Sequence, residues 1–136
     1  TQLDSLYIWK IKVHPTISEK KFKDLIPASC NEKFIFTNQP LNTIFQETKL
    51  LVTIESSSAF DAVACGISVA IVGSRSGPTI NPLLNIVNNQ YWSVCYSSNE
   101  LEAAILRDFP EKKLNISEYL QPTTKESVIR MMNFEL

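Results

Sequence analysis

The chain has 136 residues and a mass of 15.4 kDa, which is enough for one domain and too short for two. Hydrophobic residues make up 44% and charged residues 20%, so the composition is globular and argues against disorder. A formal net charge of -1, without an extended basic run, argues against a nucleic-acid backbone as the main ligand.

Short β-rich runs alternate with amphipathic segments along the chain. This alternation predicts an α/β domain, a Rossmann-like parallel sheet with helices on both faces. The β-rich runs are almost continuously apolar, as expected of strands buried on both sides. Strands are predicted at residues 6–13, 33–37, 50–54, 69–72 and 92–96. We expect all of them in a single domain covering residues 1–136.

Helices are predicted between these strands. Ser18 is suited to cap the first of them. Its inward face is predicted to carry Phe22, Leu25 and Ile26. The lysines at positions 20, 21 and 23 then form its solvated face.

Further helices are predicted downstream. They cover residues 41–47, residues 57–65, a segment that begins at Pro82, a segment from 101 to 109, and residues 124–133. Gly66 is expected to end the second of these. The helix after Pro82 is predicted to turn Leu83, Ile86 and Val87 inward.

Ligands of open parallel sheets collect beyond the carboxyl ends of the strands, and His14-Pro15 follows the first predicted strand. Proline stiffens this turn and disfavours a helical conformation at His14. The imidazole is then held where it can donate a hydrogen bond to a phosphate oxygen. A lone histidine in a surface turn is the alternative interpretation.

A serine-rich run, Glu55-Ser56-Ser57-Ser58, joins the third predicted strand to a helix. Backbone N–H groups and the positive end of the helix dipole suit an anion at such a junction. A structural interpretation is also available, because Ser58 and Asp61 have the spacing of a capping box. A cap needs one serine and not three, so both interpretations stay open.

The third candidate segment is Gly73-Ser74-Arg75-Ser76-Gly77-Pro78-Thr79, after the fourth predicted strand. Its glycines permit close approach of a ligand, and Arg75 can pair with a diphosphate or a carboxylate. The ending of a Walker loop is missing. The alternative is a flexible surface loop without a ligand.

The cysteines and the ends of the chain bear on where the protein acts. Cys65 and Cys95 stand in apolar surroundings and are predicted to be core residues. Reduced thiols, the lack of a signal peptide and the lack of a long apolar stretch favour a cytoplasmic protein. The chain does not begin with methionine, so we expect a piece of a larger protein. No spacing suggests a metal site, and no cofactor is expected.

The combination of His14-Pro15 with the later run from Glu55 through Ser56, Ser57 and Ser58 to Asp61 resembles GT-B-type glycosyltransferases. It is similar to the C-terminal half of enzymes that build bacterial surface polysaccharides, namely sialyltransferases, polysialyltransferases and teichoic-acid or capsule polymerases. Those enzymes carry a His-Pro motif and a downstream Ser-Ser motif. The likeness spans residues 6–109 and implies one half of a GT-B fold.

The resemblance implies specific roles. His14 would contact the donor phosphate and stabilise the leaving group, and the serines would bind phosphate or nucleoside with Asp61 in support. Glu55 stands where the polymerases have aspartate, so its role stays open. The donor would be a nucleotide-sugar such as a CMP-sugar.

The glycan acceptor and the general base would belong to a missing N-terminal half, so the isolated domain is expected to bind without turnover. A peripheral membrane association of the full enzyme is compatible with this interpretation. Two alternatives stay open: a sugar-nucleotide epimerase domain of the same fold, and a non-catalytic flavodoxin-like interaction module.

Overall fold

The computed structural model describes residues 7–107, and the chain divides into two compact units, Thr1–Glu47 and Thr48–Leu136. Both units are α/β, and every strand pairing in the described residues is parallel. The predicted fold class is therefore confirmed, with the strands distributed over two small sheets. The predicted helix at residues 124–133 and Phe109 lie outside the described residues.

The first unit contains a two-stranded parallel sheet. Strand β1 (Trp9–Ile11) pairs with β2 (Phe34–Phe36), with Trp9 opposite Phe34. Their rings lie 6.5 Å apart between centroids, a contact typical of aromatic pairs across a sheet. The helical segments of this unit are α1 (Glu19–Lys23), the 3₁₀ helix η2 (Ala28–Lys33) and α2 (Leu41–Phe45).

Helix α1 begins as predicted but ends early. The hydroxyl of Ser18 accepts a hydrogen bond from the amide of Lys21 at 3.5 Å, so Ser18 is the N-cap. Phe22 packs edge-on against Phe36 with ring centroids 6.2 Å apart. The prediction that Leu25 faces inward is wrong, because the helix ends at Lys23 and Leu25 is 79% exposed.

One lysine of α1 does more than face solvent. The ammonium of Lys23 lies 4.7 Å from the centre of the Phe36 ring and 2.6 Å from a carboxylate oxygen of Glu19. A cation over an aromatic face and an i,i+4 ion pair both stabilise the helix weakly at an exposed site. The solvated face predicted for this helix is confirmed, because Lys20, Lys21 and Lys23 are all exposed.

The second unit contains a three-stranded parallel sheet in the order β3-β4-β5. The strands are β3 (Leu50–Thr53), β4 (Ser68–Val72) and β5 (Trp92–Cys95). The central strand β4 is buried from Ser68 to Ile71, as expected of a strand covered on both sides.

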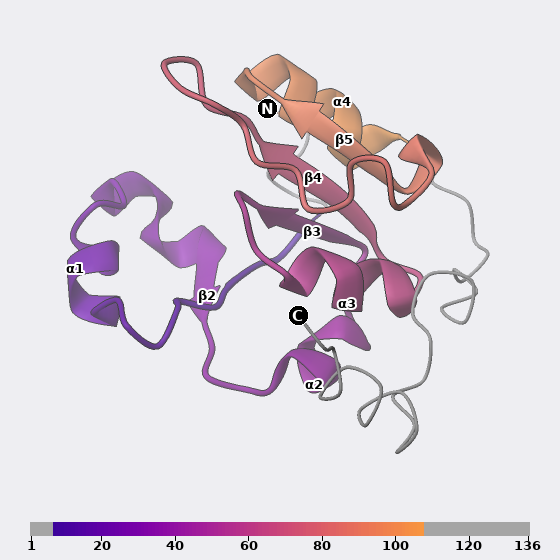
Figure 1. Ribbon diagram of the computed structural model, residues 1–136. Helices are drawn as coiled ribbons and strands as arrows, with labels where there is room; N and C mark the ends of the chain where they lie inside the picture. Colours follow the sequence, from indigo (N-terminus) through magenta and orange to yellow (C-terminus); the bar gives the residue numbers. More distant parts are fainter. Residues whose placement is uncertain (1–6, 108–136) are drawn as a thin grey trace, which may run out of the picture. The chain divides into compact units, whose positions relative to one another are not determined.

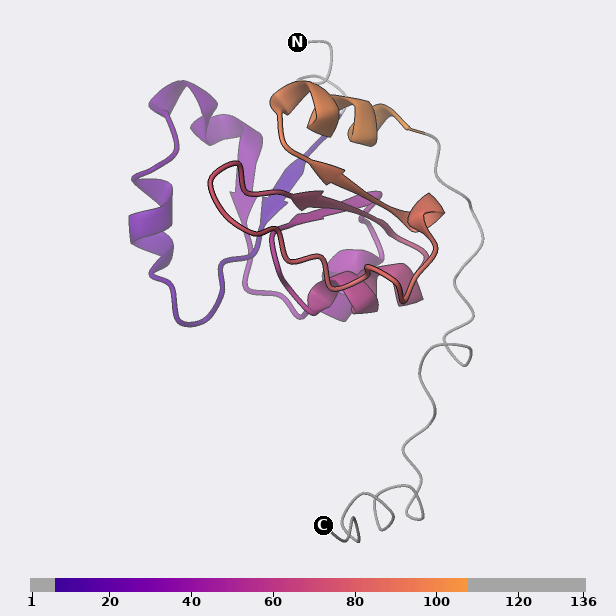
Figure 2. The same ribbon diagram turned by 45° about the horizontal axis from the view of Figure 1, so that its top comes forward.

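Helix α3 (Ser58–Ala64) covers one face of this sheet and helix α4 (Ser98–Leu106) covers the other, as the two ribbon views show (Figures 1 and 2). Leu101, Ala104 and Ile105 of α4 point inward as predicted. Ala104 packs on Ala70 and Cys95 in one hydrophobic cluster. The predicted arrangement of helices on both faces is confirmed for this unit.

Gly66 ends helix α3 as predicted. It has a positive φ of 82°, a conformation that costs other residues about 1–2 kcal/mol. The amide of Ile67 bonds to the carbonyl of Ala62, and the amide of Gly66 to that of Val63, each at 2.9 Å. These two bonds define a Schellman motif.

The predicted helix after Pro82 is wrong. A series of turns takes its place, followed by the short 3₁₀ helix η3 (Asn89–Tyr91). The side-chain oxygen of Asn81 accepts the amide of Leu83 at 2.9 Å, which fixes a turn, and Asn85 has a φ of 62°, which an α-helix does not allow. Leu83 and Val87 are nevertheless buried, whereas Ile86 is 47% exposed.

The end of this turn segment is tied to the last strand. The indole N–H of Trp92 donates to the carbonyl of Val87 at 2.9 Å. Trp92 is partly buried, so the bond satisfies a polar group that would otherwise lose solvent.

Candidate functional site

The carboxyl ends of β3, β4 and β5 lie at one edge of the sheet, because the three strands are parallel. Two of the predicted site segments lie just beyond these strand ends. Ser56, Ser57 and Ser58, here called the serine turn, follow β3, and residues 73–79, the Arg75 loop, follow β4. In open α/β sheets, ligands bind beyond the carboxyl ends of the strands, which is this edge.

The serine turn is held by its own hydroxyls. The hydroxyl of Ser56 accepts the amide of Ser58 at 3.2 Å and lies 2.8 Å from the hydroxyl of Ser58. Ser57 is exposed and makes no side-chain capping bond. Of the three serines, Ser57 is thus the one whose hydroxyl does not take part in holding the turn.

The predicted capping box of Ser58 and Asp61 is wrong. Ser58 is the first residue of α3, and the serine that accepts a helix-end amide is Ser56, two positions earlier. Ser58 therefore directs its hydroxyl to Ser56 and not to the next turn. Asp61 stands in the first turn of α3, and Glu55 lies in the bend before it; both are exposed.

The Arg75 loop is folded by internal hydrogen bonds. The amide of Ser74 donates to the hydroxyl of Thr79 at 3.0 Å, and the amide of Ser76 to the hydroxyl of Ser74 at 3.3 Å. The Nε–H of Arg75 donates to the carbonyl oxygen of Tyr96 at 2.6 Å. The loop is thereby fastened to the exit of β5.

Tyr96 is a candidate site residue that the sequence reasoning missed. Its ring lies so close to Gly73 that a Cβ placed there would come within 2.3 Å of Tyr96 Cε1. With the Tyr96 ring in this position, there is no room for a side chain at Gly73. The sequence did contain a signal for Tyr96. It is an aromatic residue directly after one strand, and the neighbouring strand is followed by a glycine-containing loop.

A hollow of about 270 Å³ lies beside this ring, between the carboxyl ends of β4 and β5 and the start of α4. We call it the Tyr96 hollow. It is lined by Val72, Arg75, Cys95, Tyr96, Ser97, Ser98 and Leu101.

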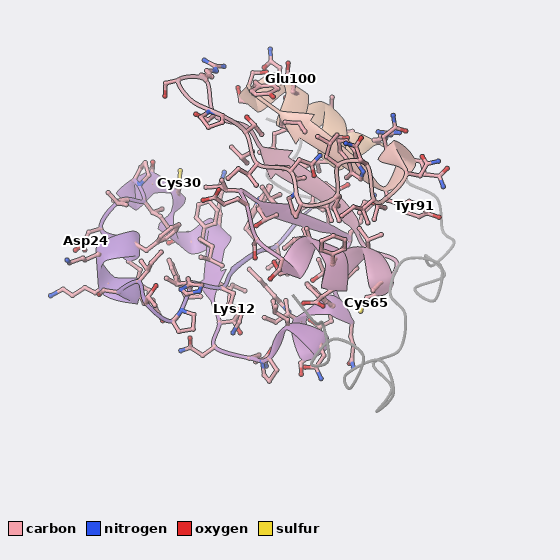
Figure 3. The ribbon with its side chains drawn as sticks, viewed as in Figure 1. Lys12, Asp24, Cys30, Cys65, Tyr91 and Glu100 are labelled. Atoms are coloured by element: carbon pink, nitrogen blue, oxygen red, sulfur yellow. The ribbon has the colours of Figure 1, made fainter. Side chains whose placement is uncertain are left out.

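Two side chains of opposite charge bond the backbone of Tyr96. Arg75 bonds the carbonyl oxygen of Tyr96, while the carboxylate of Glu100 accepts the amide of the same residue at 2.5 Å. Glu100 projects from the first turn of α4, where it is labelled in Figure 3. The hydroxyl of Ser97 caps that helix by accepting the Glu100 amide at 3.2 Å.

The two cysteines predicted to be core residues differ. Cys95 is buried and lines the Tyr96 hollow, and burial, reinforced by the nearby Glu100 carboxylate, raises the pKa of its thiol. Cys65 is exposed, so that prediction is wrong. It is the C-cap residue that follows α3, and Figure 3 labels it there.

His14 belongs to the first unit, in a turn closed by a 2.8 Å bond from the Ile17 amide to the His14 carbonyl. Its Nδ1 accepts the amide of Thr16 at 3.3 Å and lies 2.7 Å from the Thr16 hydroxyl. An amide only donates, so Nδ1 is the acceptor and the neutral ring carries its proton on Nε2. The exposed imidazole thus has an N–H available, as the phosphate-donor hypothesis requires.

Each candidate residue is therefore placed within its own unit. The serine turn and Arg75 follow neighbouring strands of the three-stranded sheet, whereas His14 follows β1 of the two-stranded one. The convergence of His14 with the serine turn stays a prediction.

Within residues 7–107, no three side chains of the metal-binding types gather as a set of ligands. Over the same residues, the helices are too short and too polar to traverse a bilayer.

Compared with known proteins, the chain gives no significant match to a family model, to a curated protein or to a solved structure.

Proposed function

We propose that the chain is the donor-binding part of a cytoplasmic glycosyltransferase, one that binds a nucleotide-sugar in surface polysaccharide synthesis. The observation that carries the proposal is the shared sheet edge. The serine turn and the Arg75 loop leave adjacent parallel strands at their carboxyl ends. Ligands of open α/β sheets bind at this edge.

The groups at hand suit a phosphate. The Ser57 hydroxyl has no capping partner, the guanidinium of Arg75 uses its Nε on Tyr96, and His14 carries an N–H on Nε2. Such donors stabilise the negative charge that a leaving nucleotide gains as an acceptor hydroxyl attacks the anomeric carbon. His14 has this role in the proposal, with Glu55 and Asp61 supporting the serine turn.

One observation favours a second candidate, a non-catalytic interaction module. Several donors of the candidate site already have partners inside it. The amides of Ser58, Ser74 and Ser76 all bond to neighbouring hydroxyls. In such a module, the polar strand ends only close turns.

A titration of the 136-residue chain separates the two candidates. CMP, UDP and inorganic phosphate are added to ¹⁵N-labelled protein while amide shifts are followed. The transferase proposal expects CMP to shift His14, the serine turn and Arg75. If none of the nucleotides shifts any amide signal, the interaction module is favoured and the transferase proposal is overturned.

A double variant provides the control. His14→Ala with Ser57→Ala should weaken CMP binding, since each charge-assisted hydrogen bond is worth roughly 1.5–3 kcal/mol. Both residues are exposed, so the melting temperature should change little. A large fall in melting temperature with unchanged CMP affinity would show that the two residues are structural.

A further inference from the structure

We propose that the Tyr96 hollow binds the planar, uncharged base of the nucleotide, stacked on the ring of Tyr96. This inference rests on the proposed nucleotide-binding function and assigns one part of the ligand to one part of the sheet edge. The phosphate is assigned to the serine turn.

The charges bound to the backbone of Tyr96 argue for an uncharged group. Arg75 lines the hollow and bonds the carbonyl of Tyr96, while Glu100 of α4 bonds the amide of the same residue, so side chains of both charges bind this stretch of backbone. A neutral ring needs no counter-charge at such a place, and its polar edge can bond to the hydroxyls of Ser97 or Ser98.

The lining and size of the hollow agree with a single ring system. Val72, Leu101 and Tyr96 give it apolar walls. Its volume of about 270 Å³ is just below the range of about 300–1,000 Å³ that is usual for sites of drug-sized ligands. This volume is sufficient for one base.

The ring of Tyr96 is positioned to serve as a stacking surface. One side is held against the backbone at Gly73, where a Cβ would approach to 2.3 Å. The backbone of Tyr96 is fixed on both sides by Arg75 and Glu100. Even so, 46% of the residue remains exposed, so the ring is held in place without being buried.

The spacing of the strands fits one nucleotide. Neighbouring strands lie 4.7–4.9 Å apart, so the exits of β3 and β5 are separated by two spacings, roughly 10 Å. A nucleoside monophosphate would span this separation by crossing the end of β4, since the hollow adjoins α4 and the serine turn leads into α3 on the other face of the sheet.

The test compares two probes that share a phosphate and differ in the base. CMP and ribose 5-phosphate are titrated by calorimetry into the wild-type chain and into Tyr96→Ala, Tyr96→Phe and Leu106→Ala. Leu106 is the matched control, because it is exposed and lies at the far end of α4. Methyl shifts of Val72 and Leu101 report entry into the hollow.

The wild type should bind CMP more tightly than ribose 5-phosphate. Tyr96→Ala should weaken CMP binding roughly 5- to 150-fold, the range for removing one base-stacking aromatic, and leave ribose 5-phosphate unchanged. Tyr96→Phe and Leu106→Ala should bind both probes like the wild type, and CMP alone should shift the two methyl groups.

Two results separate the inference from the proposed function. If the wild type binds CMP and ribose 5-phosphate with equal affinity, the base site is overturned and the phosphate site is not. The same holds if Tyr96→Ala weakens the binding of both probes equally. The lack of binding of either probe to the wild type overturns both proposals.

Discussion

The ring of Tyr96 lies against Gly73 so closely that any side chain at position 73 would displace it, since a Cβ there would be 2.3 Å from Cε1. Gly73 also continues the parallel ladder, because its amide donates to the Cys95 carbonyl at 2.9 Å. The glycine thus joins two strand exits and determines where an aromatic ring lies.

Gly73→Ala should move the Tyr96 ring and leave the sheet intact. The ring is partly exposed and can rotate away, so we expect the stability loss to stay near 1 kcal/mol. The aromatic NMR signals of Tyr96 should change. Gly77→Ala is the matched control, because the nearest atom to its Cβ would be Ser74 Oγ at 3.5 Å. Unchanged Tyr96 signals in Gly73→Ala would contradict the contact.

Ser56 and Ser57 should differ in their effect on stability. Ser56→Ala removes the acceptor of the Ser58 amide, and the loss of such a helix-end bond costs about 1 kcal/mol. Ser57→Ala should stay within about 0.5 kcal/mol, since its side chain makes no capping bond. Urea unfolding of the two variants measures both values. A larger loss for Ser57→Ala would show that the capping assignment is wrong.

The exposed Cys65 should react with iodoacetamide well before the buried Cys95. Burial raises the pKa of Cys95, which opposes formation of its thiolate. Mass spectrometry of the native protein after timed labelling distinguishes the two sites. Equal labelling rates under native conditions would contradict the burial of Cys95.

The Cys95 thiol also makes the free energy of unfolding depend on pH. Above the ordinary thiol pKa of 9.0, the unfolded chain loses the Cys95 proton while the folded chain keeps it. The free energy of unfolding should therefore fall as the pH rises past that value. Below it, Cys95 should not change the free energy of unfolding with pH. Cys95→Ala should show a shallower alkaline decline than the wild type in urea titrations. An identical slope would exclude Cys95 as the cause.

Leu83 should matter for stability more than its neighbour Leu84. Leu83 is fully buried in the segment between β4 and β5, so Leu83→Ala should cost about 2–5 kcal/mol. Leu84 is 54% exposed, and Leu84→Ala should cost little. Thermal unfolding of the pair tests whether this segment packs as described, and similar losses would contradict it.

The strands were the most predictable part of the chain. Each predicted strand overlaps an observed one, and only β4 extends beyond its prediction, by starting at Ser68. The continuous apolar run that a buried parallel strand such as β4 needs is visible in the sequence. The observed β1 is shorter, and only Trp9–Ile11 pairs. Gly66 was also predictable, because few other residues adopt its positive φ.

The helix after Pro82 failed because side-chain chemistry overrode apolar spacing. Leu83 and Val87 have helical spacing and are both buried, yet Asn81 and Asn85 impose turns on the same segment. The Tyr96 hollow was missed for another reason. It depends on Arg75 reaching Tyr96, 21 residues later, and such a contact has no local signature in the sequence.

The two tryptophans of the chain fall in different units, Trp9 beside Phe34 and Trp92 bonded to Val87. Each tryptophan is therefore an intrinsic fluorescence probe of one unit. Replacing either with phenylalanine leaves a protein whose intrinsic emission follows a single unit during denaturation. Coincident transitions in the two variants would mean that the halves unfold as one cooperative body, and separate midpoints would mean that each half melts independently.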